Sequence, residues 1–233
     1  MSNIIEDLMT SKSIDGESVV ILYKDIYVRI FEKIFPECKA LNEYTKTNTP
    51  KFPERNLTVN FAEAVKKRFP GTICWYEYQF KRSTEDGENS NNHLDAVIII
   101  DNDELRHVLI CESKRNFPEN GLTGIKDDIA RIYSSVSIVD ASIIKDEKPC
   151  SYFGVILLDG WDDKERLRDK TPRGKPYLTK WNENTMGREF WPDSFKDSNE
   201  LYEARVDFNN EELPINKTIK DHYSIKTIMW PIG

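Results

Sequence analysis

Asp95, Glu112 and Lys114 are the residues of this chain whose types and spacing best suit a chemical role. Asp95 begins an apolar run that ends at Ile100, and Glu112 and Lys114 follow a second apolar run that begins at Val108. Two carboxylates beside an ammonium group suit a hard divalent cation, with water and a substrate phosphate completing its shell. The lysine would then lie beside the phosphate, where it could orient or deprotonate the attacking water and stabilise the charge that develops.

Two strands joined by a tight turn must bring these residues together. The two β-branched runs predict buried strands, and the polar residues 101–104 between them predict a turn. Side chains alternate along a strand, so Glu112 and Lys114 share a face. A two-residue turn that includes Asp103 places Asp95 on that same face, either opposite Glu112 with Cβ atoms about 5 Å apart or diagonal to it. A three-residue turn without a bulge would place Asp95 on the other face.

This arrangement resembles the motif of the PD-(D/E)xK nuclease superfamily. Asp95 is followed seventeen residues later by Glu112-Ser113-Lys114 at the end of the next expected strand. The superfamily includes type II restriction endonucleases and many repair and phage-defence nucleases. The resemblance implies that Asp95 and Glu112 are metal ligands, that the Ser113 backbone carbonyl is a candidate third ligand, and that Lys114 is the catalytic lysine. It covers about residues 55–160, and Leu94 stands where the superfamily's name has proline.

Two other acids are candidates for completing the site. The superfamily often supplies an extra glutamate from the helix before the first strand, which makes Glu63 a candidate, although a surface pair with Lys67 at i,i+4 explains Glu63 equally well. Glu77 lies in the segment 73–80, which we expect to form the first strand. It faces either the metal site or solvent.

Candidate nucleic-acid contacts flank the expected site. His93 shares the face of Asp95 by the two-residue period, with a structural role at the start of the strand as the alternative. Lys126 and Arg131 lie off the apolar stripe of the helix expected after the lysine. In this superfamily that helix packs beside the active site, and solvent-facing charges on the helix are the alternative explanation.

The chain as a whole is acidic, with a formal net charge of −7 at pH 7. Binding to phosphates needs local cations rather than a basic whole. The segment 164–181 is rich in Lys and Arg with interleaved aromatic residues, and it supplies Arg173 and Lys175 as candidate nucleic-acid contacts. Interspersed acids leave a mixed-charge, solvated surface as the alternative.

The hydropathy pattern predicts the remaining elements. We expect a frayed end over 1–15, a flexible polar loop over 81–92, helices over 16–35 and 57–69, and strands over 152–158, 202–208 and 223–232. With the resemblance, this implies an α/β fold with a restriction-endonuclease-like central mixed β-sheet flanked by helices, and a C-terminal β-containing extension. We expect one nuclease domain over 1–233, with its core at about 55–160 and the extension at 161–233.

Composition indicates the compartment. No apolar stretch approaches the roughly 20 residues of a membrane helix, and the N-terminus has no signal-peptide pattern. The cysteines are widely spaced without a CxxC pair, which suits a reducing environment and argues against a zinc site. We therefore expect a cytoplasmic protein with no membrane partner.

The expected function is that of a metal-dependent DNA endonuclease of the restriction or phage-defence type. It would use Mg²⁺, with Mn²⁺ as a substitute, and a homodimer that cuts both strands is expected by family analogy alone. Two alternatives stay open. One is a nuclease fold kept as a binding or assembly module, in which the charges form an ordinary ion pair at the sheet end. The other is a nuclease that acts on RNA.

Overall fold

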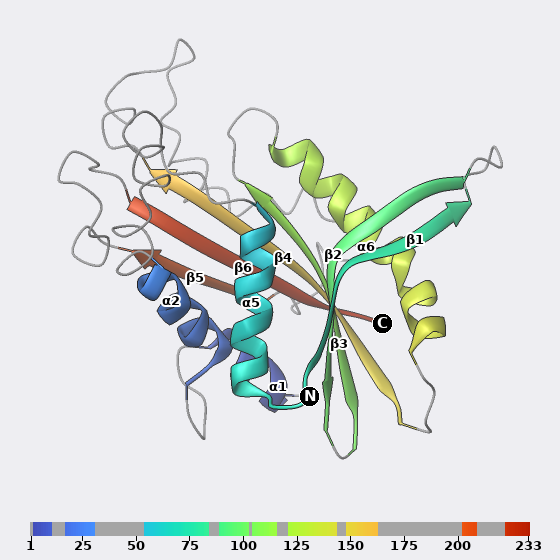
Figure 1. Cartoon of the computed structure of the whole chain (residues 1–233), viewed down its shortest axis with the longest axis horizontal. Coiled ribbons are helices and arrows are strands. Elements are labelled where there is room, and N and C mark those ends of the chain that lie inside the picture. Colours follow the sequence, from blue (N-terminus) through green and yellow to red (C-terminus); the bar gives the residue numbers. More distant parts are fainter. Residues whose placement is uncertain are drawn as a thin grey trace, which may run out of the picture.

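The computed structural model describes residues 2–10, 17–30, 54–83, 89–102, 104–115, 121–143, 148–162, 202–208 and 222–233 (Figure 1). Its helices and strands are, in chain order, α1 Ser2–Met9, α2 Val19–Arg29, α5 Glu54–Arg68, β1 Ile73–Ser83, β2 Asn89–Asp101, β3 Arg106–Arg115, α6 Gly121–Ser142, β4 Cys150–Asp162, β5 Tyr202–Phe208 and β6 His222–Ile232. In this part of the chain, no helix combines the length and apolar character needed to cross a membrane.

In the described part of the chain, six strands form one open sheet in the order β1-β2-β3-β4-β6-β5 (Figure 1). β1, β2 and β3 form an antiparallel meander. β3 and β4 are parallel, and α6 provides the crossover that such a pair requires. β6 lies antiparallel between β4 and β5. The protein is therefore an α/β protein with a mixed sheet, as the sequence predicts.

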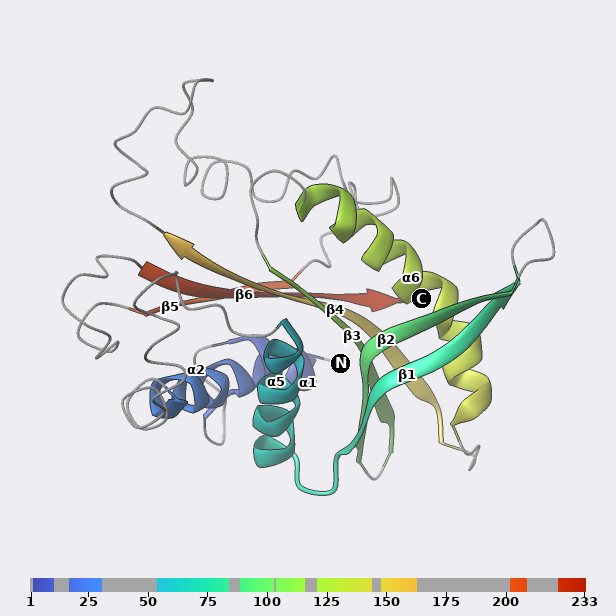
Figure 2. The ribbon, with the colours of Figure 1, turned by 45° about the horizontal axis from the view of Figure 1, so that its top comes forward.

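Helices cover both faces of the sheet and create two cores. α1, α2 and α5 lie on one face and α6 lies on the other (Figure 2). Phe61 of α5 shares a buried cluster with Ile98 of β2. Ile132 of α6 shares a second cluster with Ile110 of β3 and Trp230 of β6. The central strands are buried from both sides, which explains their uninterrupted apolar runs.

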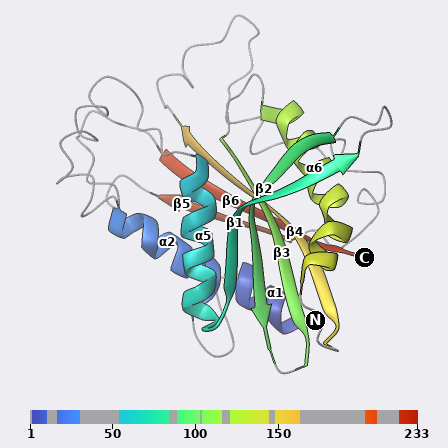
Figure 3. The ribbon, with the colours of Figure 1, turned by 45° about the vertical axis from the view of Figure 1, so that its right-hand side comes forward.

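The β1–β2 hairpin bends at Glu77, which lies between the Tyr76–Ala96 and Tyr78–Leu94 pairs and so level with Asp95. Glu77 has a φ of 53°, in the left-handed region that residues other than glycine rarely adopt. Tyr76, just before the bend, packs against the core on the α5 side, whereas Tyr78, just after it, is buried on the α6 side. Figure 3 shows the outer half of the hairpin turned toward α6. Asp95 thus lies where the hairpin leaves the plane of the sheet.

The expectation of a frayed N-terminus over 1–15 is wrong for the residues that form α1. Ile4 and Leu8 are buried in the core on the α5 side. Arg68 of α5 also donates to Asp7 at 2.6 Å. The i,i+4 spacing of Ile4 and Leu8 is the pattern of a buried helix face, and it is too short a signal to stand out from polar neighbours.

The polar segment 81–92 is mostly strand, contrary to the expected flexible loop. β1 continues to Ser83 and β2 begins at Asn89, and the backbone of residues 81–83 pairs with that of residues 89–91. Polar side chains do not prevent a strand when the opposite strand satisfies its backbone groups.

The two C-terminal strands lie close to their predicted bounds, and β6 pairs with β4 from Tyr152 to Asp162. The C-terminal β segment therefore belongs to the central sheet.

Candidate active site

The register of β2 and β3 places Asp95 opposite Glu112. The ladder ends at the pair of Ala96 and Cys111, and continuing its register by one residue brings Asp95 level with Glu112. Asn102 closes the turn at the other end. Its N–H donates to the carbonyl of the residue three positions on at 3.3 Å, and its Oδ1 accepts that residue's N–H at 2.7 Å. This is one of the two registers that the sequence predicts.

Ser113 holds the Asp95 carboxylate. Oδ2 of Asp95 accepts hydrogen bonds from the Ser113 backbone N–H at 2.7 Å and from the Ser113 hydroxyl at 2.6 Å. Among the described residues, no side chain or backbone group donates to Oδ1 of Asp95. One carboxylate oxygen is therefore fixed by β3 while the other can accept a ligand.

Glu112 is buried on the face of β3 that packs against α6. Its side chain is 3 % exposed, and its Oε1 accepts a hydrogen bond from Arg131 Nη1 at 2.9 Å. Burial, helped by the nearby Asp95 charge, raises the pKa of Glu112 to about 9 against the opposing effect of the Arg131 guanidinium. Without an added cation, Glu112 therefore carries a proton at neutral pH.

Lys114 lies on the same face of β3 and contacts Asp128 of α6. Lys114 Nζ is 3.3 Å from Asp128 Oδ2, and Arg131 Nη2 donates to Asp128 Oδ1 at 2.9 Å. Asp128 is 1 % exposed. Its burial raises the carboxyl pKa against the pull of Lys114 and Arg131. Asp128 thus joins the strand lysine to the helix arginine.

These five residues, Asp95, Glu112, Lys114, Asp128 and Arg131, form what we call the charged cluster. When all five are ionised, the cluster has one more acid than base. A net negative charge in a mostly buried place favours either a proton or an added cation. The raised pKa of Glu112 favours the first of these two, a proton on the Glu112 carboxyl group.

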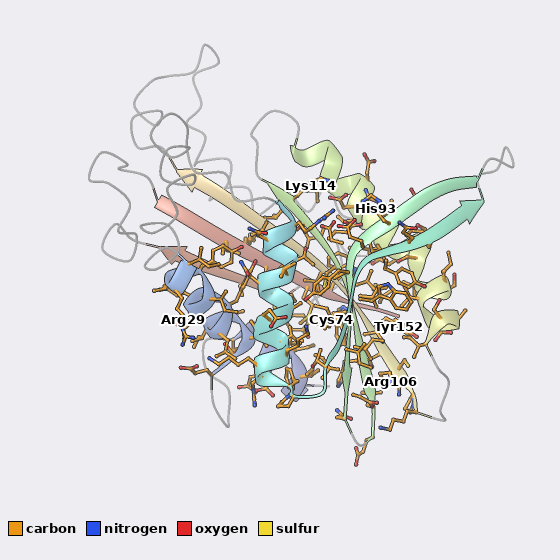
Figure 4. All side chains as sticks on the ribbon, in the orientation of Figure 1. Arg29, Cys74, His93, Arg106, Lys114 and Tyr152 are labelled. Carbon is orange, nitrogen blue, oxygen red and sulfur yellow. The ribbon has the colours of Figure 1, made fainter. Side chains whose placement is uncertain are left out.

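Glu77 and His93 lie beside the cluster rather than within it. Glu77 pairs with Arg55 of α5, with Nη2 to Oε1 at 2.9 Å, and His93 Nε2 is 4.0 Å from the other Glu77 oxygen. His93 is 57 % exposed. Figure 4 shows His93 and Lys114 at the same end of the sheet and Arg106 at the opposite end. His93 can therefore be reached from solvent near Lys114.

Of the remaining predicted residues, the structure describes only the side chain of Glu63, which is not brought to the cluster. Glu63 lies on the exposed side of α5 and pairs with Lys66 at 2.9 Å, an i,i+3 partner in place of the expected Lys67. Lys126 belongs to α6, but its side chain lies outside the described part of the chain. Arg173 and Lys175 lie wholly outside it.

Asp128 is the cluster member that sequence reasoning missed. A signal for it exists, because Asp128 occupies a position of the apolar stripe of α6, three residues after Ile125 and four before Ile132. A carboxylate on a buried helix face needs a charged or hydrogen-bonded partner. Arg131, which the sequence offers as a candidate nucleic-acid contact, binds Glu112 and Asp128 in this structure.

The oxygen donors at this end of β2 and β3 fit a hard cation such as Mg²⁺. In the described residues, no three His, Cys, Asp or Glu side chains are grouped tightly enough to bind a metal by themselves. Mg²⁺ at phosphate-transfer sites is usually held by one or two carboxylates, with waters and substrate phosphate as further ligands. Asp95 and Glu112 supply those two carboxylates, and one Asp95 oxygen accepts no hydrogen bond from the described residues.

Comparisons of the chain with protein-family models, with curated proteins and with solved structures give no match. Function must therefore be argued from the residues and their geometry.

Proposed function

We propose that this chain is a metal-dependent nuclease with a restriction-endonuclease-like fold that hydrolyses phosphodiester bonds in DNA. The observation that carries the proposal is the position of Asp95 level with the buried Glu112, with Lys114 on the same face of β3. A buried acid whose pKa is raised this far is costly for stability alone, and such groups concentrate at functional sites.

Each residue has a chemical role in this proposal. Asp95 and Glu112 would hold the Mg²⁺, or Mn²⁺ in its place, after Glu112 releases its proton. The ion would supply Lewis acidity and positive charge at the scissile phosphate. Lys114 is 30 % exposed, so its ammonium group can reach a bound phosphate and the attacking water.

The charge balance of the cluster supports the same proposal. A divalent ion would change the excess of one negative charge into an excess of one positive charge. A phosphodiester group carries one negative charge and would neutralise it. The cluster is therefore matched to a metal and a phosphodiester together.

Cleavage assays with matched variants test this function. Asp95→Asn keeps a hydrogen-bond acceptor for Ser113 but removes the charge, and Lys114→Met removes the ammonium group. Asp101→Asn and Lys148→Met change the same residue types in an ion pair of 3.0 Å at the opposite end of β2. With Mg²⁺ or Mn²⁺, we expect the wild type and both controls to cut plasmid DNA. The two cluster variants should be slower by at least about 100-fold, the usual loss when a transition-state contact is removed.

An equal loss of cleavage rate in the two controls, or cleavage that persists in both cluster variants, would refute the assignment of Asp95 and Lys114 to a nuclease site. Single-stranded DNA and RNA in the same assay distinguish the proposed substrate from the RNA alternative.

One observation favours a second candidate, a nuclease-like sheet that serves as a binding or assembly module. Glu112 and Asp128 are already bridged by Arg131, as they would be in a purely structural ion-pair network. Calorimetry with Mn²⁺ separates the two candidates. A structural network predicts no binding that depends on Asp95, whereas a nuclease site predicts binding that Asp95→Asn weakens.

A further inference from the structure

Arg131 donates a hydrogen bond to Glu112, one of the two acids that the proposed metal would need as ligands. Its guanidinium bridges two acids, with Nη1 at 2.9 Å from Glu112 Oε1 and Nη2 at 2.9 Å from Asp128 Oδ1. Both acids are almost completely buried, whereas the Arg131 side chain is 25 % exposed. The arginine is thus the partner that solvent reaches, and among the described residues it makes the only hydrogen bond to the Glu112 carboxyl group.

We propose that Arg131 is a resident cation that closes the metal site of the metal-free protein and is displaced from Glu112 when a divalent ion binds. Asp128 then retains the displaced guanidinium beside the site. This inference rests on the proposed function and adds a regulatory step to it, because metal entry requires an internal cation to leave.

The physical basis is competition between the Arg131 guanidinium and a divalent ion for the same Glu112 oxygen. A guanidinium within hydrogen-bond distance of a metal ligand repels a divalent ion and must be separated from the ligand before the ion can bind. Asp128 makes that separation incomplete, because one hydrogen bond of Arg131 survives while the other breaks. Arg131 therefore lowers the affinity for the metal and stays close enough to meet the substrate phosphate.

Measuring Mn²⁺ affinity calorimetrically, without nucleic acid, tests this inference independently of cleavage. Arg131→Met removes the competing charge, and we expect Mn²⁺ to bind at least tenfold more tightly than in the wild type. Arg131→Lys keeps a positive charge and should bind Mn²⁺ with an affinity closer to the wild type than to Arg131→Met. Arg106→Met is the matched control, because Arg106 is also buried and paired with an acid, Asp101, at 3.1 Å, but lies at the opposite end of β3 (Figure 4). It should leave the affinity unchanged.

The outcomes separate this inference from the function beneath it. Tighter Mn²⁺ binding by Arg131→Met alone supports the resident cation. Unchanged or weaker binding by Arg131→Met, with normal binding by the wild type, overturns the resident cation and leaves the metal site standing. Absence of Mn²⁺ binding in the wild type and in Arg131→Met overturns both.

A second measurement uses the wild-type protein and does not depend on whether a variant folds. Phenylglyoxal modifies accessible arginines, and peptide mass spectrometry reports each site separately. We expect Mn²⁺ to increase the labelling of Arg131 by several-fold relative to Arg106, because the guanidinium loses its Glu112 partner. Labelling of Arg131 that Mn²⁺ leaves unchanged, at a concentration where calorimetry shows the metal bound, would overturn the inference.

Discussion

The pH dependence of stability offers a direct test of the buried Glu112. In the metal-free folded protein its pKa is about 9, against an ordinary value of 4.5 for the unfolded chain. Between these two values, the folded protein holds a proton that the unfolded chain releases. The unfolding free energy therefore decreases as pH rises, by up to about 1.4 kcal/mol per pH unit for one proton. The contribution of the Glu112 proton to the unfolding free energy is fully present below pH 4.5 and is lost as pH rises through 9.

Glu112→Gln removes this titration while keeping an oxygen that can accept from Arg131. We expect its stability relative to the wild type to improve with pH, by up to about 2.7 kcal/mol between pH 6 and pH 8. Urea unfolding at pH 6, 7 and 8 in the presence of a chelator measures the difference. Glu104→Gln, at the exposed β2–β3 turn, is the matched Glu-to-Gln control. The contrary result is a stability difference between Glu112→Gln and the wild type that changes with pH no more than it does for the control. That result would show that the effect of Arg131 on the Glu112 pKa outweighs the effect of burial, and that Glu112 is ionised in the metal-free protein.

Three further predictions concern the fold that positions the cluster. Glu77→Gly should be more stable than Glu77→Ala by about 1 to 2 kcal/mol in chemical denaturation, because the φ of 53° is unfavourable for any residue with a Cβ. The order should reverse at the exposed neighbour Gln79, and the same order at both sites would contradict the bend. Gly154→Ala should cost about 1 to 3 kcal/mol or prevent folding, since a Cβ there would lie 2.2 Å from the Trp230 ring. Leu8→Ala should lower the unfolding free energy by about 2 to 5 kcal/mol, whereas a frayed N-terminus predicts no change.

The sequence alone determined the local part of the site. Glu112 and Lys114 share a face because strand side chains alternate, whatever surrounds the strand. Asp95 comes opposite Glu112 because a short turn joins two apolar strands and sets their register. Such relations depend on neighbours in one hairpin, so they can be read from residue types and spacing.

Only the tertiary structure decided what surrounds those three residues. Asp128 and Arg131 meet β3 because α6 crosses the sheet and packs against it, and the pattern of α6 by itself does not say which strand residues its charges will contact. The bend at Glu77, where the hairpin changes from one core to the other, is equally invisible to an alternating pattern. Contacts between distant segments depend on the packing of whole elements. The hairpin's charges could therefore be foreseen, whereas the partners that set the Glu112 pKa could not.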